Sequence, residues 1–189
     1  VSQRSSLTIL YAEPSQYKSR VDYMSDFGKH EFDLSSHSGG FKAVPGFSQM
    51  VSTHNKAHLI SVLGFERSRL GQLMQVDEGA YIGKVSPIFT TPSFKADWDK
   101  HSLYQNVETL DGRSNEPEFV SADSPSDILG ILNRIKLSSA GEILMIAPFA
   151  TKPLSVGVAI FLVNNLNDVI LKYDHPIKKG DSSSGIGNI

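Results

Sequence analysis

The chain contains no cysteine among its 189 residues, so it can form no disulfide, no thiolate metal site and no cysteine nucleophile. It also lacks an excess of charge of one sign, because 18 Lys and Arg residues face 20 Asp and Glu residues. Duplex nucleic-acid binding needs clustered basic side chains, and this balance gives no indication of them. No apolar run approaches the roughly 20 residues of a membrane-spanning helix, and the first residues contain no signal-peptide core. We therefore expect a cytoplasmic protein that binds neither membranes nor duplex nucleic acid.

Several well-known catalytic and binding motifs are missing as well. The sequence has no GxxxxGK[ST] phosphate loop, no GxGxxG after a strand and no GxSxG elbow, which removes the main support for an ATPase, a classical dehydrogenase or an α/β-hydrolase. His54 and His58 are four residues apart, as metal ligands on a helix would be. Asn55 stands where a zinc protease would need glutamate, and no third ligand follows. We expect no metal and no cofactor.

The composition is that of a globular domain, with 40% hydrophobic and 20% charged residues. We expect one domain overall. Residues 57–189 would form its α/β core, and residues 1–56 would pack on that core. Within the N-terminal part, residues 7–12 form an apolar run that predicts a buried strand, and residues 32–49 suggest a hairpin that turns at two consecutive glycines.

Strand-like and helix-like segments alternate along the rest of the chain. The expected strands are apolar on both faces, and the helix after Ser124 has an N-cap, a proline in its first turn and an acidic residue close behind. This order predicts an α/β, Rossmann-like fold with a mostly parallel sheet covered by helices on both faces. The expected strands are 57–64, 80–85, 118–121, 142–147 and 169–173; the expected helices are 67–75, 94–110, the one after Ser124, and 151–165.

In such a fold the loops that follow the strands meet at one edge of the sheet, where ligands bind. The loop at residues 148–153 is the most informative, because Thr151 is placed to cap the next helix and Pro153 is tolerated in its first turn. Lys152 adds a positive charge to the helix dipole, and together they would favour a phosphate or carboxylate by about 1 to 2 kcal/mol. Simple capping beside a solvated lysine is the alternative.

The same segment, MIAPFATKPLSVGVAIF, resembles the strand-to-helix turn of CARF-type Rossmann-like domains, which sense cyclic oligonucleotides in bacterial defence systems. Their turn usually reads Gly-Gly-Thr-Lys, and here Phe149 and Ala150 stand in place of the two glycines. The resemblance covers about the last 50 residues. It implies that Thr151 and Lys152 contact phosphate or ribose at a dimer interface.

Further polar residues are expected at this edge. Glu66 lies three residues before Arg69 and could simply pair with it; alternatively Glu66 accepts ribose hydroxyls while Arg67 or Arg69 binds an anion. Ser86 would open the loop after the strand at 80–85 and is expected to contact the ligand.

Asp174 and His175 follow the last strand. They are expected to be either surface residues or proton-transfer groups. Upstream of them, the helix at 154–166 carries no charge and should be buried on nearly every side, against a second copy, a partner subunit or the rest of a larger chain.

The main hypothesis is a sensor domain that binds an anionic small molecule, such as a nucleotide or cyclic oligonucleotide, at the carboxyl edge of the sheet. One alternative is an enzyme acting on a phosphorylated or nucleoside-like substrate, with Glu66, Asp174 and His175 as candidate acid and base groups. A third hypothesis is a protein-interaction domain of a larger defence assembly.

Overall fold

The computed structural model describes residues 7–17, 35–38, 40–42, 44–48, 56–64, 66–75, 81–110, 114–166, 168–178 and 183–187. These residues fall into two compact units, Val1–His30 with Lys179–Ile189, and Glu31–Lys178. The single-domain organisation expected from the composition stays a prediction.

The first unit contains one small antiparallel pair, formed by β1 (Gln16–Tyr17) and β9 (Ser183–Ser184). The buried strand expected at residues 7–12 is wrong, because these residues lie outside any helix or strand. Leu7 and Leu10 are 84% and 92% exposed. An apolar run becomes a buried strand only when it pairs with a second strand and packs on a core, and among the described residues of this unit the run has neither.

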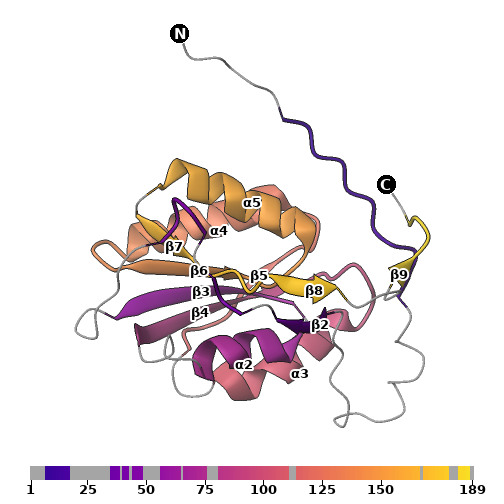
Figure 1. The fold of residues 1–189 in the computed structure, drawn as a ribbon, viewed down its shortest axis with the longest axis horizontal. Coiled ribbons are helices and arrows are strands. Elements are labelled where there is room, and N and C mark those ends of the chain that lie inside the picture. The colour runs from indigo at the N-terminus through magenta and orange to yellow at the C-terminus, as the bar shows by residue number, and fades with distance from the viewer. Residues whose placement is uncertain are drawn as a thin grey trace. The chain divides into compact units, whose positions relative to one another are not determined.

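The second unit is built on a five-stranded sheet in which all neighbouring strands are parallel. The strand order is β5-β4-β3-β6-β7, with α4 and α5 on one face and α2 and α3 on the other (Figure 1). The α/β, Rossmann-like fold expected from the sequence is confirmed. The strands are β3 (Ala57–Leu63), β4 (Ile82–Thr90), β5 (Glu118–Val120), β6 (Leu144–Pro148) and β7 (Val169–Leu171); the helices are α2 (Arg67–Gln75), α3 (Trp98–Leu110), α4 (Pro125–Ser138) and α5 (Lys152–Asn164).

The central strand β3 is buried along its whole length because its side chains pack into two cores, one on each face of the sheet. Ile60 packs on the face that α4 and α5 cover, in a cluster that includes Phe161. Leu59 packs on the opposite face with Leu70 of α2. Successive side chains of a strand point to opposite faces, so a strand covered on both sides must be apolar at nearly every position.

Two helix starts follow the capping rules from which they were predicted. Ser124 accepts a hydrogen bond from the Asp127 amide at 3.3 Å, and Pro125 opens α4. Thr151 caps α5 by accepting from the Leu154 amide at 3.5 Å. Both helices therefore begin where an oxygen satisfies an amide that has no partner within the helix.

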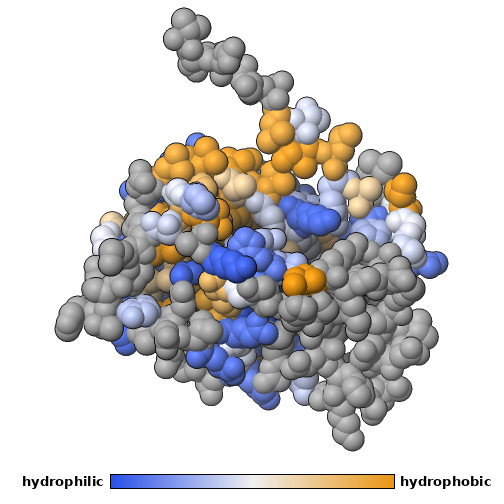
Figure 2. All heavy atoms as spheres, viewed as in Figure 1, coloured by the Kyte–Doolittle hydropathy of each residue, from blue (hydrophilic) through white to orange (hydrophobic). Residues whose placement is uncertain are grey.

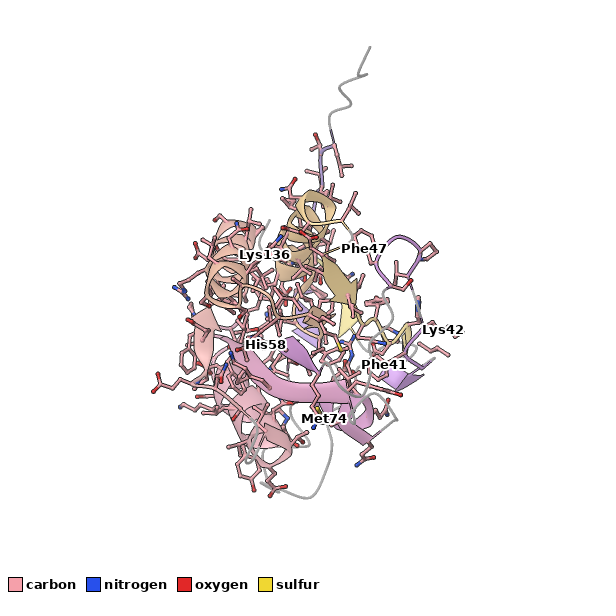
Figure 3. All side chains as sticks on the ribbon, turned by 90° about the vertical axis from the view of Figure 1, so that its left-hand side faces the viewer. Phe41, Lys42, Phe47, His58, Met74 and Lys136 are labelled. Atoms are coloured by element: carbon pink, nitrogen blue, oxygen red, sulfur yellow. The ribbon has the colours of Figure 1, made fainter. Side chains whose placement is uncertain are left out.

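The hairpin expected at residues 32–49 is wrong for the part of it that the structure describes. Strand β2 (Ser35–Ser38) pairs antiparallel with β8 (Pro176–Lys178), and Lys42 forms a bridge with Tyr173. Residues on both sides of the expected glycine turn thus pair with the chain after β7. Phe41 and Phe47, labelled in Figure 3, then pack against the two different cores of the sheet.

Among the described residues, no helix combines the length and the apolar character that crossing a membrane would require.

Candidate functional site

The direction of the connections reverses between β3 and β6, which are neighbours in the sheet. In open α/β sheets, ligands bind at the carboxyl ends of the two strands where this reversal occurs. Here those ends lie close together, since a Cβ atom on Gly64 would come within 2.6 Å of the Phe149 carbonyl oxygen. The Gly64 carbonyl oxygen accepts hydrogen bonds from Ser102 Oγ at 2.6 Å and from Asn106 Nδ2 at 3.2 Å, which tie α3 to the same place.

A buried ion cluster joins the ends of β3, β6 and β7. The Arg69 guanidinium donates from Nε and Nη2 to the two carboxylate oxygens of Asp174, both at 2.6 Å. Its Nη1 donates to the Phe149 carbonyl oxygen at 3.3 Å and lies 3.5 Å from Glu66 Oε2. The guanidinium also lies 4.8 Å from the centre of the Phe149 ring. The structure therefore brings together Glu66, Arg69 and Asp174, three of the predicted site residues.

This cluster limits what Arg69 can do for a ligand. The Asp174 and Arg69 side chains are only 1% and 10% exposed, and the bidentate pair uses the planar fork by which arginine holds anions. A bound anion would have to compete with Asp174 for it. With two carboxylates around one guanidinium the cluster carries a formal charge of −1, so a positive charge for an anion must come from elsewhere.

The start of α5 lies directly after β6 and presents Lys152 to solvent. The first turn of α5 contains no acidic residue, whereas the first turn of α4 contains Asp127. The Thr151 hydroxyl is engaged on both sides: it donates to the Ala122 carbonyl oxygen at 2.6 Å and accepts from the Leu154 amide. Since Pro153 has no amide hydrogen, an anion here would depend on Lys152 and the helix dipole more than on a cradle of backbone amides.

Ser86 and His175 are not part of this arrangement. Ser86 was expected in a loop, but it lies inside β4, four residues before the strand ends at Thr90. At about 3.3 Å per residue, Ser86 is roughly 13 Å from the carboxyl edge. The exposed His175 adopts a positive φ of 46° and its ring packs against Tyr173, with the ring centres 5.0 Å apart. Arg67 begins α2, but its side chain lies outside the described residues.

Sequence reasoning missed a second polar cluster, around the buried His58 (Figure 3). Because His58 lies on the strand β3, the helical spacing assumed for a metal pair with His54 does not apply; His54 itself is outside the described residues. The described part of the chain contains no group of three or more potential metal ligands. His58 Nε2 lies 2.8 Å from Ser86 Oγ, and its Nδ1 lies 2.9 Å from Glu142 Oε2. Only the fold brings these residues together, since long stretches of sequence separate them.

Comparison with known proteins adds no further assignment: the chain matches no protein-family model, and no curated protein matches its sequence.

Proposed function

We propose that the chain is a ligand-binding α/β domain that takes a small anionic molecule, of the nucleotide class, at the carboxyl edge of its sheet. The observation that carries this proposal is the position of Lys152. An exposed lysine opens the 13-residue helix that follows β6, one of the two strands between which the connections reverse. A helix of this length adds about half a positive charge at its start, and this dipole favours phosphate.

The ion cluster beside this position supports recognition of a nucleotide rather than of phosphate alone. A carboxylate offers about four lone-pair positions, so Glu66 can accept ribose hydroxyls while Oε2 faces Arg69. Glu66 follows β3 and Lys152 follows β6, and these strands are adjacent. A ligand of nucleotide size could therefore place its phosphate at α5 and its ribose near α2. A sensing role in a defence assembly rests on the resemblance of residues 145–161 to CARF-type domains.

The same geometry favours binding over acid–base catalysis by the carboxyl-edge residues. Both oxygens of Asp174 accept from Arg69, and the Asp174 side chain is 1% exposed, so a substrate has little access to this carboxylate. His175 packs on Tyr173 instead of joining Glu66 and Asp174. The three candidate residues thus do not form a set within hydrogen-bond reach of one another, which acid–base catalysis needs.

The first test is thermal unfolding in the presence of mono-, di- and cyclic nucleotides, cyclic oligonucleotides and inorganic phosphate. A ligand at 100 times its Kd should add about 2.7 kcal/mol of stability, which corresponds to several degrees in Tm. Lys152→Ala should weaken binding by about tenfold or more, the value of one charge-assisted hydrogen bond. Lys56→Ala is the matched control, because Lys56 is an exposed lysine that precedes β3, at the opposite edge of the sheet.

Two results would reject the proposal. One is the absence of any shift with the whole panel, which leaves Thr151 and Lys152 as an ordinary helix start. The other is a shift of the same size in wild type and Lys152→Ala, which places the anion at another site.

We also propose that two copies of the chain associate through the outer face of α5. That helix was expected to be buried on nearly every side, but Ile160 and Val163 are 44% and 61% exposed, and Leu166 just beyond it is 51% exposed. Apolar atoms gather over α5 in Figure 2. The wild-type protein should sediment as a dimer that Val163→Asp converts to a monomer. A monomeric wild type at micromolar concentration would reject the proposed dimer, but it would not bear on the proposal of ligand binding.

A further inference from the structure

The second polar cluster lies away from the carboxyl edge, toward the amino-terminal ends of the strands. His58 is the second residue of β3, and Ser86 is the fifth residue of β4. Glu142 and Ser139 come from the segment between α4 and β6 and lie 2.9 and 3.1 Å from His58 Nδ1. Asn115, in the segment before β5, lies with its Nδ2 2.9 Å from Ser86 Oγ.

The chemistry at the two ends of this chain of hydrogen bonds fixes its direction. The Glu142 carboxylate can only accept, so His58 Nδ1 carries a hydrogen and, in the neutral ring, Nε2 is left as an acceptor. The Asn115 amide nitrogen can only donate, so Ser86 Oγ accepts from it and directs its own hydrogen to His58 Nε2. Ser86, His58 and Glu142 therefore have the order and tautomer of a nucleophile, a base and a residue that orients the base.

We propose that Ser86, His58 and Glu142 form an acyl-transfer site that hydrolyses small carboxylic esters. Ser86 Oγ attacks the ester carbonyl carbon as its proton moves to His58 Nε2. The bond from carbon to the alkoxide oxygen breaks, and His58 returns the proton to the departing alcohol. Water then attacks the acyl-serine with His58 again as base, which releases the acid and restores Ser86.

The surroundings of His58 keep it in the form that this step needs. Burial lowers the pKa of His58 from its ordinary value, and the nearby positive charge of Lys84 lowers it further, while Glu142 opposes both. Lys84 and Glu142 are the charged groups that act on the ring, and they face each other at 3.7 Å. His58 is consequently neutral at pH 7 and can accept a proton.

The position of Ser86 sets the size of the substrate. Ser86 is only 6% exposed, but Asn115, which touches it, is exposed. A small acyl group would reach Ser86 beside Asn115, whose amide could then donate to the developing oxyanion. This serine lies within a strand, so the missing GxSxG elbow does not bear on it.

Labelling with a small alkyl fluorophosphonate tests the proposal on the intact chain. Ser86 Oγ would form a bond to phosphorus while the P–F bond breaks, with fluoride as the leaving group and the serine proton passing to His58. We expect one label per chain, mapped to Ser86 by peptide mass spectrometry, and none in Ser86→Ala. Ser61→Ala is the matched control. Ser61 Oγ is also a buried strand hydroxyl, but it has no hydrogen-bond partner in the described parts of the chain and so no base to activate it. Ser61→Ala should therefore be labelled at Ser86 as wild type is.

Two further variants distinguish a catalytic cluster from a structural one. His58→Gln should slow labelling by about 100-fold or more. Glu142 is a positioning residue, and its side chain is 41% exposed, so Glu142→Gln should fold. Labelling should rise with pH as His58 loses its proton, and because Glu142 raises the pKa of His58, the midpoint should move to lower pH in Glu142→Gln.

A wild-type protein without label on Ser86 would overturn the proposal, and that result requires no variant to fold. So would a labelling rate that His58→Gln leaves unchanged. Hydrolysis of p-nitrophenyl acetate that follows the same variants would extend the result from the probe to an ester. Lys152→Ala should alter neither readout, so this proposal and nucleotide binding can fail separately.

Discussion

Replacement of Arg69 by leucine is the most direct test of how the carboxyl edge is held together. Leucine keeps an aliphatic side chain at this position of α2. It removes the two N–H groups that donate to the Asp174 carboxylate at 2.6 Å. It also removes the donor to the Phe149 carbonyl oxygen and the contact with the Phe149 ring. The Asp174 side chain, which is 1% exposed in the wild type, would lose the guanidinium that compensates its charge.

The expected cost follows from this burial. Removing one partner of a buried ion pair typically costs about 3–5 kcal/mol, mostly because the other charge stays buried. For a chain of this size Tm changes by roughly 2–4 °C per kcal/mol, so Tm should fall by about 6–20 °C. In the double variant Arg69→Leu/Asp174→Leu the most buried charge of the cluster is removed as well, and only the Glu66 carboxylate, 10% exposed, loses the guanidinium. At least half of the loss should therefore be recovered.

Urea unfolding at pH 7.5, followed by circular dichroism, measures these differences. Arg134→Leu is the matched control, because Arg134 pairs with Glu118 at 2.8 Å but the two side chains are 60% and 38% exposed. A surface pair of this kind contributes about 0–1 kcal/mol. If Arg69→Leu cost no more than Arg134→Leu, or if the double variant were less stable than Arg69→Leu, the reasoning from a buried, stranded charge would be refuted.

Three further predictions concern the helices and His58. Gly157→Ala should cost about 1–3 kcal/mol of stability, because a Cβ atom there would overlap side-chain and backbone atoms of α4. Gly130→Ala should stabilise the protein by up to about 1 kcal/mol, because a Cβ atom there meets nothing within 4 Å. The urea midpoints of the two variants test this, and equal effects would contradict the packing argument. Thr151→Ala should cost about 0.5–2 kcal/mol and Thr151→Ser much less, measured by thermal unfolding; a neutral Thr151→Ala would exclude the cap. Because the pKa of His58 is lowered in the folded state, the unfolded chain binds more protons below about pH 6.5, so stability should fall between pH 7.5 and 5.5. His58→Gln should lose less stability over this pH range than wild type does. An equal loss in both proteins would contradict the lowered pKa of His58.

The sequence predicted the helices and the strands β3 and β6 well, for reasons that are local. Ser124 with Pro125 determines the start of α4, and Thr151 determines that of α5, because each supplies an oxygen to an amide of the first turn. Five of the seven residues of β3 are apolar, with His58 and Ser61 as the exceptions, and such a run is typical of a strand covered on both faces. Glu66, Arg69 and Asp174 were expected at one edge because parallel strands end together, and they do meet there.

The errors arose where pairing with a distant segment decides the structure. Pro87 suggested a loop after residue 85, because proline cannot donate in a sheet. It is tolerated within β4 because β5 pairs only with residues 88–90, so on that side Pro87 faces no ladder partner among the described strands. The Ser86–His58 contact was missed for the same reason, because it depends on the register between β3 and β4. That register places Ile60 opposite Ser86, and His58, two residues before Ile60, points to the same face of the sheet. Neither can be deduced from one segment alone.

The two residues that follow β6 pack on opposite faces of the sheet. Phe149 packs into the core on the α2 side, where its ring and carbonyl oxygen are occupied by Arg69. Ala150 packs on the opposite side, against the core under α4 and α5. Both residues have side chains where a glycine pair would let backbone approach a phosphate, so the loop cannot enclose an anion with its amides alone. Recognition of the proposed anion would then rest on side chains, and Lys152, exposed at the start of α5, is a cation directly after this loop.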